Sequence, residues 1–153
     1  MIYAQGQKII VGDSDRTVLE MLQIRLDTAG YHVCLARNGP AVLEVLKQVR
    51  PAVMILDAGL AELSAFDILD TMKKRGEKPC PVLLIGRRLA PEDVKRGIGL
   101  GVRDCMLKPF SGSDVVERVA RLLRPPVAAK PAPTPAPSSM LKPPPPEFGS
   151  AYV

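Results

Sequence analysis

Three charged side chains follow short apolar runs of the sequence, each at the point where its run ends. Asp13 comes just after KIIV, Asp57 directly follows AVMIL, and Lys108 directly follows DCML. Clustered carboxylates repel one another unless a cation neutralises them, and Mg²⁺ does this with one or two carboxylates, waters and a phosphate. A lysine offers a point charge to the same phosphate. These residue types favour phosphoryl transfer onto an aspartate, a reaction that depends on positioning and charge neutralisation.

The elements that must position these side chains are visible in the pattern of residues 8–124. Short apolar runs alternate with segments whose apolar residues recur at helical spacing, and such runs are typical of parallel strands buried on both faces. The five runs are KIIV (8–11), YHVCL (31–35), AVMIL (52–56), PVLLI (81–85) and DCML (104–107). The helical stripes are Val18, Leu19, Leu22 and Leu26; Val42, Leu43, Leu46 and Val49; Phe66, Ile68, Leu69 and Met72; and Val115, Val116, Val119 and Leu122.

A further helix is expected to open near Pro91, and the last helix to begin at Ser111 or Ser113. Five strands alternating with five helices predict an α/β fold with a doubly wound, five-stranded parallel sheet. In such sheets, ligands bind outside the carboxyl ends of the strands. If the strand order is 2-1-3-4-5, the first, third and fifth strands bring Asp13, Asp57 and Lys108 to one edge.

The composition changes abruptly after Arg124. Residues 125–153 hold ten of the chain's 16 prolines, and proline removes backbone donors and fixes φ. We therefore expect one domain over 1–124 and a proline-rich, disordered tail over 125–153, either a solvated spacer or a docking site for a proline-recognising module.

Charge and apolar content exclude several classes of protein. The net charge is +5, of which the tail supplies +1 (two lysines minus one glutamate). The sequence has no clustered basic patch, which argues against a dedicated nucleic-acid binder. No apolar run approaches the roughly 18 residues of a membrane span, and no signal peptide is evident, so a cytoplasmic protein is expected. The cysteines, Cys34, Cys80 and Cys105, lack metal-site spacing and are expected to be buried thiols.

With KIIVGDSD at the first strand, PAVMILD at the third, PVLLIG at the fourth and LKPF at the fifth, residues 8–124 resemble a response-regulator receiver domain. These domains belong to two-component signalling and chemotaxis and have a flavodoxin-like sheet. The resemblance implies that Asp57 is the phosphoacceptor and Lys108 the phosphate-contacting lysine, joined to Pro109 by a cis bond. It also implies Mg²⁺ as cofactor, bound by Asp13, Asp57 and the backbone carbonyl of Gly59.

Several positions depart from the family's pattern. The second acidic residue of the metal site falls on Ser14, a neutral and poorer ligand for a hard cation. The hydroxyl residue that binds the phosphoryl group falls on Gly86, and the switch aromatic of the fifth strand falls on Cys105. The proline and glycine common after the phosphoacceptor are replaced by Ala61 and Ala65. The conventional switch between hydroxyl and aromatic ring is therefore not expected.

Two readings of function follow from these matches and departures. In the first, a histidine kinase or phosphotransfer protein phosphorylates Asp57, and the face of helix four, strand five and helix five changes its affinity for a downstream protein. In the second, the chain is a pseudo-receiver that binds protein partners without phosphorylation. Neither reading is that of an enzyme, a membrane protein or a nucleic-acid binder. A flavodoxin-like cofactor binder is disfavoured because the acidic GDSDR loop would repel an anion. A DNA-binding regulator would need a second domain after Arg124.

Overall fold

The computed structural model describes residues 6–124; the predicted tail, 125–153, lies outside the described residues. Five parallel strands alternate with five helices, as the sequence predicts. The strands are β1 (Lys8–Gly12), β2 (His32–Ala36), β3 (Val53–Asp57), β4 (Val82–Gly86) and β5 (Val102–Leu107). The helices are α1 (Arg16–Thr28), α2 (Gly39–Leu46), α3 (Ala65–Lys74), α4 (Pro91–Gly99) and α5 (Gly112–Leu123).

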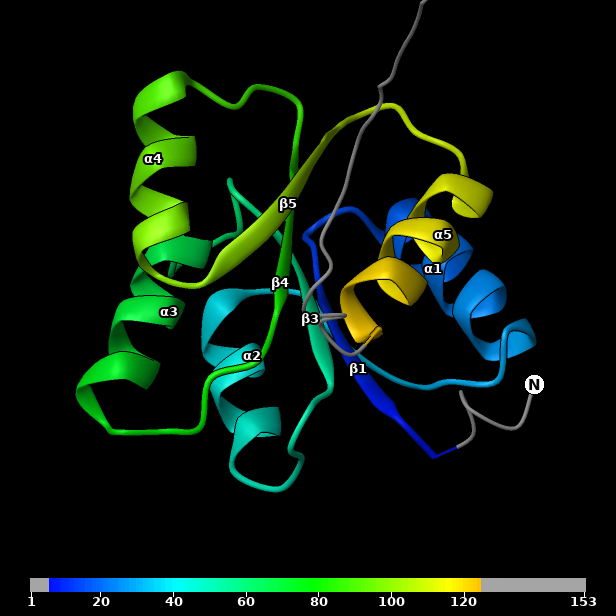
Figure 1. The fold of residues 1–153 in the computed structure, drawn as a ribbon, viewed down its shortest axis with the longest axis horizontal. Helices are drawn as coiled ribbons and strands as arrows, with labels where there is room; N and C mark the ends of the chain where they lie inside the picture. The colour runs from blue at the N-terminus through cyan, green and yellow to red at the C-terminus, as the bar shows by residue number, and fades with distance from the viewer. Residues whose placement is uncertain (1–5, 125–153) are drawn as a thin grey trace, which may run out of the picture. The chain divides into compact units, whose positions relative to one another are not determined.

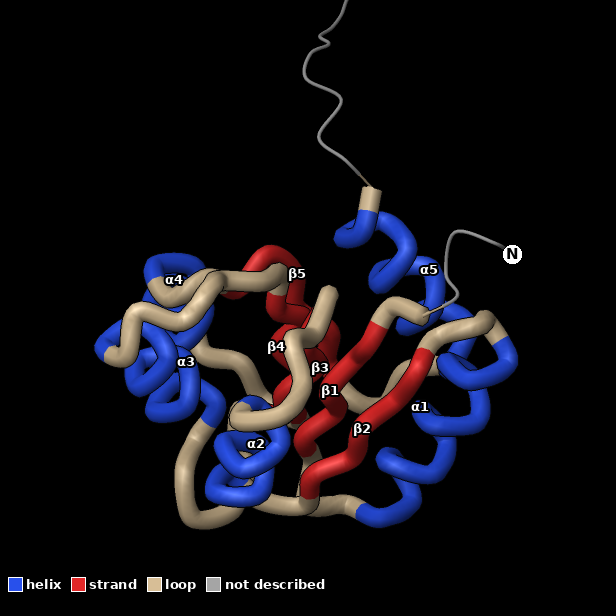
Figure 2. Tube along the Cα trace, turned by 90° about the horizontal axis from the view of Figure 1, so that it is seen from below, coloured by secondary structure: helices blue, strands red, loops and turns tan. Residues whose placement is uncertain are grey.

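The strand order is β2-β1-β3-β4-β5, which confirms the predicted doubly wound topology. Helices α1 and α5 cover one face of the sheet, and α2, α3 and α4 cover the other (Figures 1 and 2). Each face has its own hydrophobic cluster, because alternate residues of each strand point to opposite sides. Ile9, Val11 and Ile55 belong to the cluster under α1 and α5, whereas Ile10 and Met54 belong to the one under α2, α3 and α4.

Side-chain caps fix where most helices begin. Asp15 caps α1 and Asn38 caps α2, each accepting a backbone N–H of the first turn. Ser64 opens α3 with a capping box, and α4 begins at Pro91 as expected. Ser111 accepts the N–H of Asp114 at 3.1 Å, so Ser111 and not Ser113 starts α5.

Helix α2 is shorter than its apolar stripe predicts. It ends at Leu46, because the N–H groups of Lys47 and Gln48 bond to carbonyls only three residues back and tighten the last turn. Val49 lies beyond the helix but still packs against the cluster under α2, α3 and α4. The cysteines also differ from expectation, since all three are partly rather than fully buried.

Strand β5, at one edge of the sheet, is tied to α5 by an ion pair. Nη1 of Arg118 lies 2.7 Å from Oδ1 of Asp104. The same carboxylate oxygen accepts the backbone N–H of Cys105 at 2.8 Å, and Arg118 donates to the Cys105 carbonyl at 3.4 Å.

None of the helices within residues 6–124 has the length and apolar content that a membrane-spanning helix needs.

Candidate functional site

The carboxyl ends of β1, β3 and β5 bring the predicted site residues together. The ammonium nitrogen of Lys108 lies 2.6 Å from Oδ2 of Asp13 and 3.1 Å from Oδ1 of Asp57. These three residues are far apart in the sequence. They meet because β1 and β3 are neighbours in the sheet, β5 lies two strands beyond β3, and all three strands end on the same side. The peptide bond between Lys108 and Pro109 is cis, as the resemblance implies.

Burial dominates the electrostatics of this cluster. Asp13 is 1% exposed and is the one charged residue with a fully buried side chain among residues 6–124. Burial raises the pKa of Asp57 and the charge of Asp13 raises it further, against hydrogen bonds from Lys108 and Gly59 that lower it. Burial alone would lower the pKa of Lys108, but its contacts with the two carboxylates outweigh burial and raise it. Lys108 therefore stays charged and holds both acids.

The residues flanking the two acids have local structural partners. Ser14, the doubtful metal ligand, accepts the N–H of Ala61 through its hydroxyl oxygen at 3.3 Å. Asp15 accepts the N–H of Thr17 at 2.9 Å and so caps α1. The N–H of Gly59 donates to Oδ2 of Asp57 at 3.2 Å, which orients the carboxylate. The role predicted for the Gly59 carbonyl stays a prediction.

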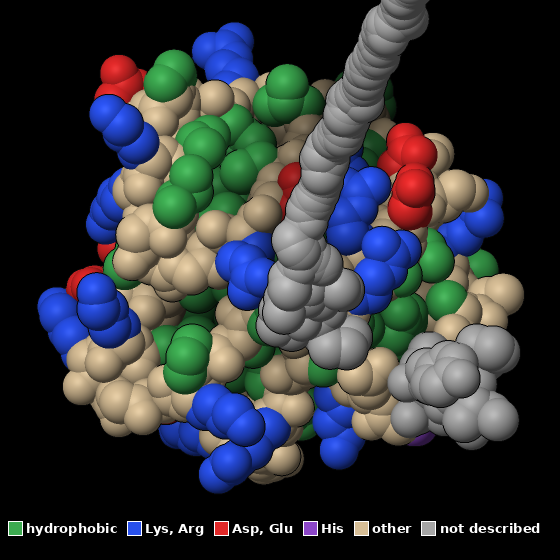
Figure 3. All heavy atoms as spheres, viewed as in Figure 1, with side chains coloured by type: hydrophobic (Ala, Val, Ile, Leu, Met, Phe, Trp, Pro, Cys, Tyr) green, Lys and Arg blue, Asp and Glu red, His purple; other side chains and the backbone are tan. Residues whose placement is uncertain are grey.

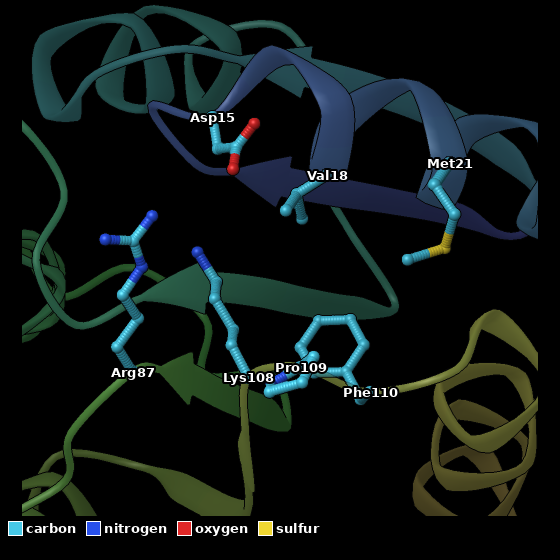
Figure 4. A pocket seen from close by; sticks show the side chains of 7 residues that line it. All are labelled: Asp15, Val18, Met21, Arg87, Lys108, Pro109 and Phe110. Atoms are coloured by element: carbon cyan, nitrogen blue, oxygen red, sulfur yellow. The ribbon is translucent and has the colours of Figure 1, made fainter.

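A cleft of about 550 Å³ opens in front of Asp57. Its lining includes Asp13, Ser14, Lys108 and, from the end of β4, Gly86, Arg87 and Arg88. A second cleft of about 440 Å³ lies beside it, between α1 and the segment after β5. Its apolar wall is Val18, Met21, Pro109 and Phe110, and Arg87 and Lys108 lie at its charged end (Figure 4).

Arg87 is a residue of the site that the sequence motifs do not single out. Both Arg87 and Arg88 line the Asp57 cleft, and Arg87 also lines the second one. The available signal was position, because Arg87 directly follows the buried strand β4 at the edge where ligands bind.

Two of the departures from the expected pattern are accommodated by apolar packing. A Cβ atom on Gly86 would lie 3.2 Å from Cδ2 of Leu89, 3.4 Å from the carbonyl oxygen of Arg88 and 3.6 Å from Cβ of Ala58, so the Leu89 side chain packs closely against the position where a side chain would start. Cys105 packs against the cluster under α2, α3 and α4. Its pKa is raised, first by burial and then by the charge of Asp104.

The donor set suits a hard divalent cation with few protein ligands. Oδ2 of Asp13 is buried and accepts no hydrogen bond of good geometry within residues 6–124, although it is ion-paired with Lys108. It therefore keeps a lone pair for a metal ion, and Asp57 supplies a second carboxylate. Among the described residues no group of three or more acidic, histidine or cysteine side chains is placed to hold a metal ion. Two carboxylates with waters and a phosphate are enough for Mg²⁺.

On the face shown in Figure 3, Lys and Arg side chains are more frequent than Asp and Glu side chains and lie in several groups between apolar and neutral ones. Hydrophobic side chains gather over α4 and β5 on this face. Ile98 of α4 and Leu107 of β5 are 62% and 58% exposed.

Comparisons with known proteins agree with this geometry. The family model of the response regulator receiver domain matches residues 9–120. The probable transcriptional regulatory protein TcrX of Mycobacterium tuberculosis is 36% identical over 124 residues, which cover 79% of this chain and 52% of that protein. The alkaline phosphatase synthesis transcriptional regulatory protein PhoP of Bacillus subtilis is 29% identical over 119 residues, or 78% and 49% of the two chains. The chain thus spans about half the length of these relatives.

Solved structures give the same fold. The chemotaxis response regulator CheY4 of Vibrio cholerae matches with a TM-score of 0.71 at 24% identity, over 76% of this chain and 98% of that one. The BeF3-activated receiver domain of DrrB, a protein of Thermotoga maritima, matches with a TM-score of 0.66 at 28% identity, over 76% and 97% of the two chains.

Proposed function

The chain belongs to the response regulator receiver family, a signalling module of two-component systems, and on this premise we propose that Asp57 accepts a phosphoryl group. The donor is a histidine kinase or a phosphotransfer protein. One observation carries the proposal: Lys108 lies within 3.1 Å of Asp57 and 2.6 Å of the buried Asp13. A single cation thus holds two acids at the mouth of a cleft.

The proposed step is an in-line displacement at phosphorus. A carboxylate oxygen of Asp57 forms the new P–O bond, while the P–N bond to the donor's histidine breaks and its electron pair leaves with the imidazole. The N–H of Gly59 holds Oδ2 of Asp57 and so presents the carboxylate in one orientation. The charge of Lys108 attracts the phosphoryl oxygens, and its raised pKa keeps it protonated at neutral pH.

Mg²⁺ is the proposed cofactor. Asp13, Asp57 and the Gly59 carbonyl would hold it, with Ser14 contributing little, because its hydroxyl oxygen already accepts the Ala61 N–H. When bound, the ion neutralises charge on the phosphoryl oxygens. Asp13 would contribute a lone pair of its buried Oδ2, which is also ion-paired with Lys108.

The proposed output is protein–protein interaction in the cytoplasm through the face of α4, β5 and α5, without enzymatic turnover, nucleic-acid contact or membrane insertion by residues 6–124. The exposed Ile98 and Leu107 support a protein-binding role for this face. The relatives are transcriptional regulators about twice as long as the matched segment, so their outputs do not transfer to this chain.

A pseudo-receiver is the second candidate. The observations that favour it are the missing hydroxyl at Gly86, the thiol at Cys105 and the structural use of Ser14. In that case Lys108 would neutralise the two acids permanently, and the same face would bind its partner at all times.

Intact mass spectrometry after incubation with Mg²⁺ and acetyl phosphate distinguishes the two. We expect the parent to gain the mass of one phosphoryl group, Asp57→Asn to gain none, and the matched control Asp70→Asn, which changes an exposed carboxylate of α3, to behave as the parent. No gain in the parent contradicts the proposal and favours the pseudo-receiver.

A further inference from the structure

Arg87 is a charged residue of the site that the proposed reaction leaves unused. It directly follows Gly86 at the carboxyl end of β4, the strand that pairs with β3 through Asp57 and Ile85. It lines the cleft in front of Asp57 and also the neighbouring cleft, and Lys108 lines both of them. In Figure 4 the side chains of Arg87 and Lys108 lie beside each other, and their nitrogen ends point the same way.

Phosphorylation of Asp57 makes the cleft more negative. Asp13, Asp15 and Asp57 line this cleft, and the ammonium of Lys108 is already shared between Asp13 and Asp57. The phosphoryl group replaces the single charge of the Asp57 carboxylate by about −1.5 to −2, the charge of a phosphate monoester, so its oxygens attract a guanidinium in addition to Lys108 and the proposed Mg²⁺. Arg87 is exposed and makes no hydrogen bond or ion pair with any side chain in residues 6–124, so its guanidinium is available.

At the end of β4, the polar side chains that line the Asp57 cleft are those of Arg87 and Arg88. Gly86 has no side chain, and Cδ2 of Leu89 and Cβ of Ala58 lie around the place where one would start. A guanidinium presents a planar fork of N–H donors that suits phosphoryl oxygens. We therefore propose that Arg87 binds the phosphoryl group on Asp57, as the second cation beside Lys108.

This inference rests on the proposed function. In it, Arg87 contacts the phosphoryl group directly and does not serve to orient the Asp57 side chain. Arg88 also lines the Asp57 cleft, together with Lys108, but does not line the second cleft. Arg37 is a matched control, because it is exposed and follows β2 at the same edge of the sheet but lines neither cleft.

The test uses beryllofluoride with Mg²⁺ as a phosphoryl mimic on the full chain labelled with ¹⁵N. The Nε–Hε resonances of arginine report contact directly, and Arg87→Gln, Arg88→Gln and Arg37→Gln assign them. We expect the Arg87 resonance to shift on addition of beryllofluoride and the Arg37 resonance to stay in place. The amide spectrum of each variant checks that its fold is intact.

Affinity gives the second readout. Arg87→Gln should weaken beryllofluoride binding at least about tenfold, as expected for loss of a charge-assisted hydrogen bond, while Arg87→Lys should fall between it and the parent. Arg37→Gln should match the parent. Equal affinities of the parent and Arg87→Gln, or a shift of the Arg88 resonance in place of Arg87, overturn the assignment and leave phosphorylation of Asp57 intact. A parent that neither binds beryllofluoride nor gains a phosphoryl group overturns both proposals.

Discussion

The hydroxyl oxygen of Ser14 accepts the backbone N–H of Ala61 at 3.3 Å, which links the loop after β1 to the loop after β3. The carbonyl of Ala61 accepts the N–H of Gly39, the first residue of α2, at 3.0 Å. Both backbone groups of Ala61 are therefore bonded. The loop that follows Asp57 is held from two sides, and Ser14 provides one of these bonds.

Replacing Ser14 by aspartate is expected to tighten Mg²⁺ binding about tenfold, since it adds a third carboxylate to Asp13 and Asp57. Isothermal titration calorimetry measures the change. Ser14→Asn, which has nearly the same shape as aspartate without its charge, should bind Mg²⁺ as weakly as the parent. Equal Mg²⁺ affinities of the aspartate and asparagine variants would show that a negative charge at position 14 does not contribute to Mg²⁺ binding.

Replacing Lys108 by methionine is expected to lower the free energy of unfolding by about 3 kcal/mol at pH 7, because it leaves two buried carboxylates without their cation. Without the hydrogen bond and charge of Lys108, which lower it, the pKa of Asp57 rises further, so the loss should shrink as the pH falls and Asp57 becomes protonated. Urea unfolding at pH 7 and at pH 5 measures both effects. Lys74→Met is the control, since its 3.1 Å pair with Asp70 is exposed and should contribute at most about 0.5 kcal/mol.

Replacing Asp57 by asparagine is expected to raise the midpoint of thermal unfolding by a few degrees at pH 7. Burial, followed by the charge of Asp13, raises the pKa of Asp57, so the folded chain binds this proton more tightly than the unfolded chain. Ionisation of Asp57 therefore weakens folding as the pH rises from its unfolded pKa through its folded pKa. Scanning calorimetry should show the advantage of the variant disappear below about pH 4. A lower midpoint than the parent at pH 7 would mean that the contact with Lys108 outweighs burial.

The thiol of Cys80 is expected to react slowly with iodoacetamide. Burial raises its pKa from 9.0 to about 11, so the thiolate fraction in the folded chain is about a hundredfold smaller than in the unfolded one at pH 8. Peptide mapping by mass spectrometry should show its alkylation rate rising about tenfold per pH unit up to pH 9.5. The same chain in urea provides the reference rate, and equal folded and unfolded rates would contradict the prediction.

The sequence was sufficient to predict the topology and the meeting of Asp13, Asp57 and Lys108. Hydrophobic periodicity specifies parallel strands, and the carboxyl ends of such strands converge on one edge. The sequence was not sufficient to predict the hydrogen bond that Ser14 accepts or the position of Arg87 in both clefts. The bond from Ser14 to Ala61 joins residues 47 positions apart and depends on how two loops close, which no local pattern encodes. The end of α2 was missed for a related reason, since Val49 keeps its packing after the helix has ended.

The ion pair between Asp104 and Arg118 also affects how molecules of this protein associate with one another. An outer strand normally exposes backbone N–H and C=O groups to which a strand of another molecule can add, a route to aggregation. At Cys105 both groups are occupied, the N–H by Asp104 and the carbonyl by Arg118. The middle of β5 is therefore blocked against intermolecular sheet extension, and the two side chains contribute to colloidal solubility as well as to the packing of α5.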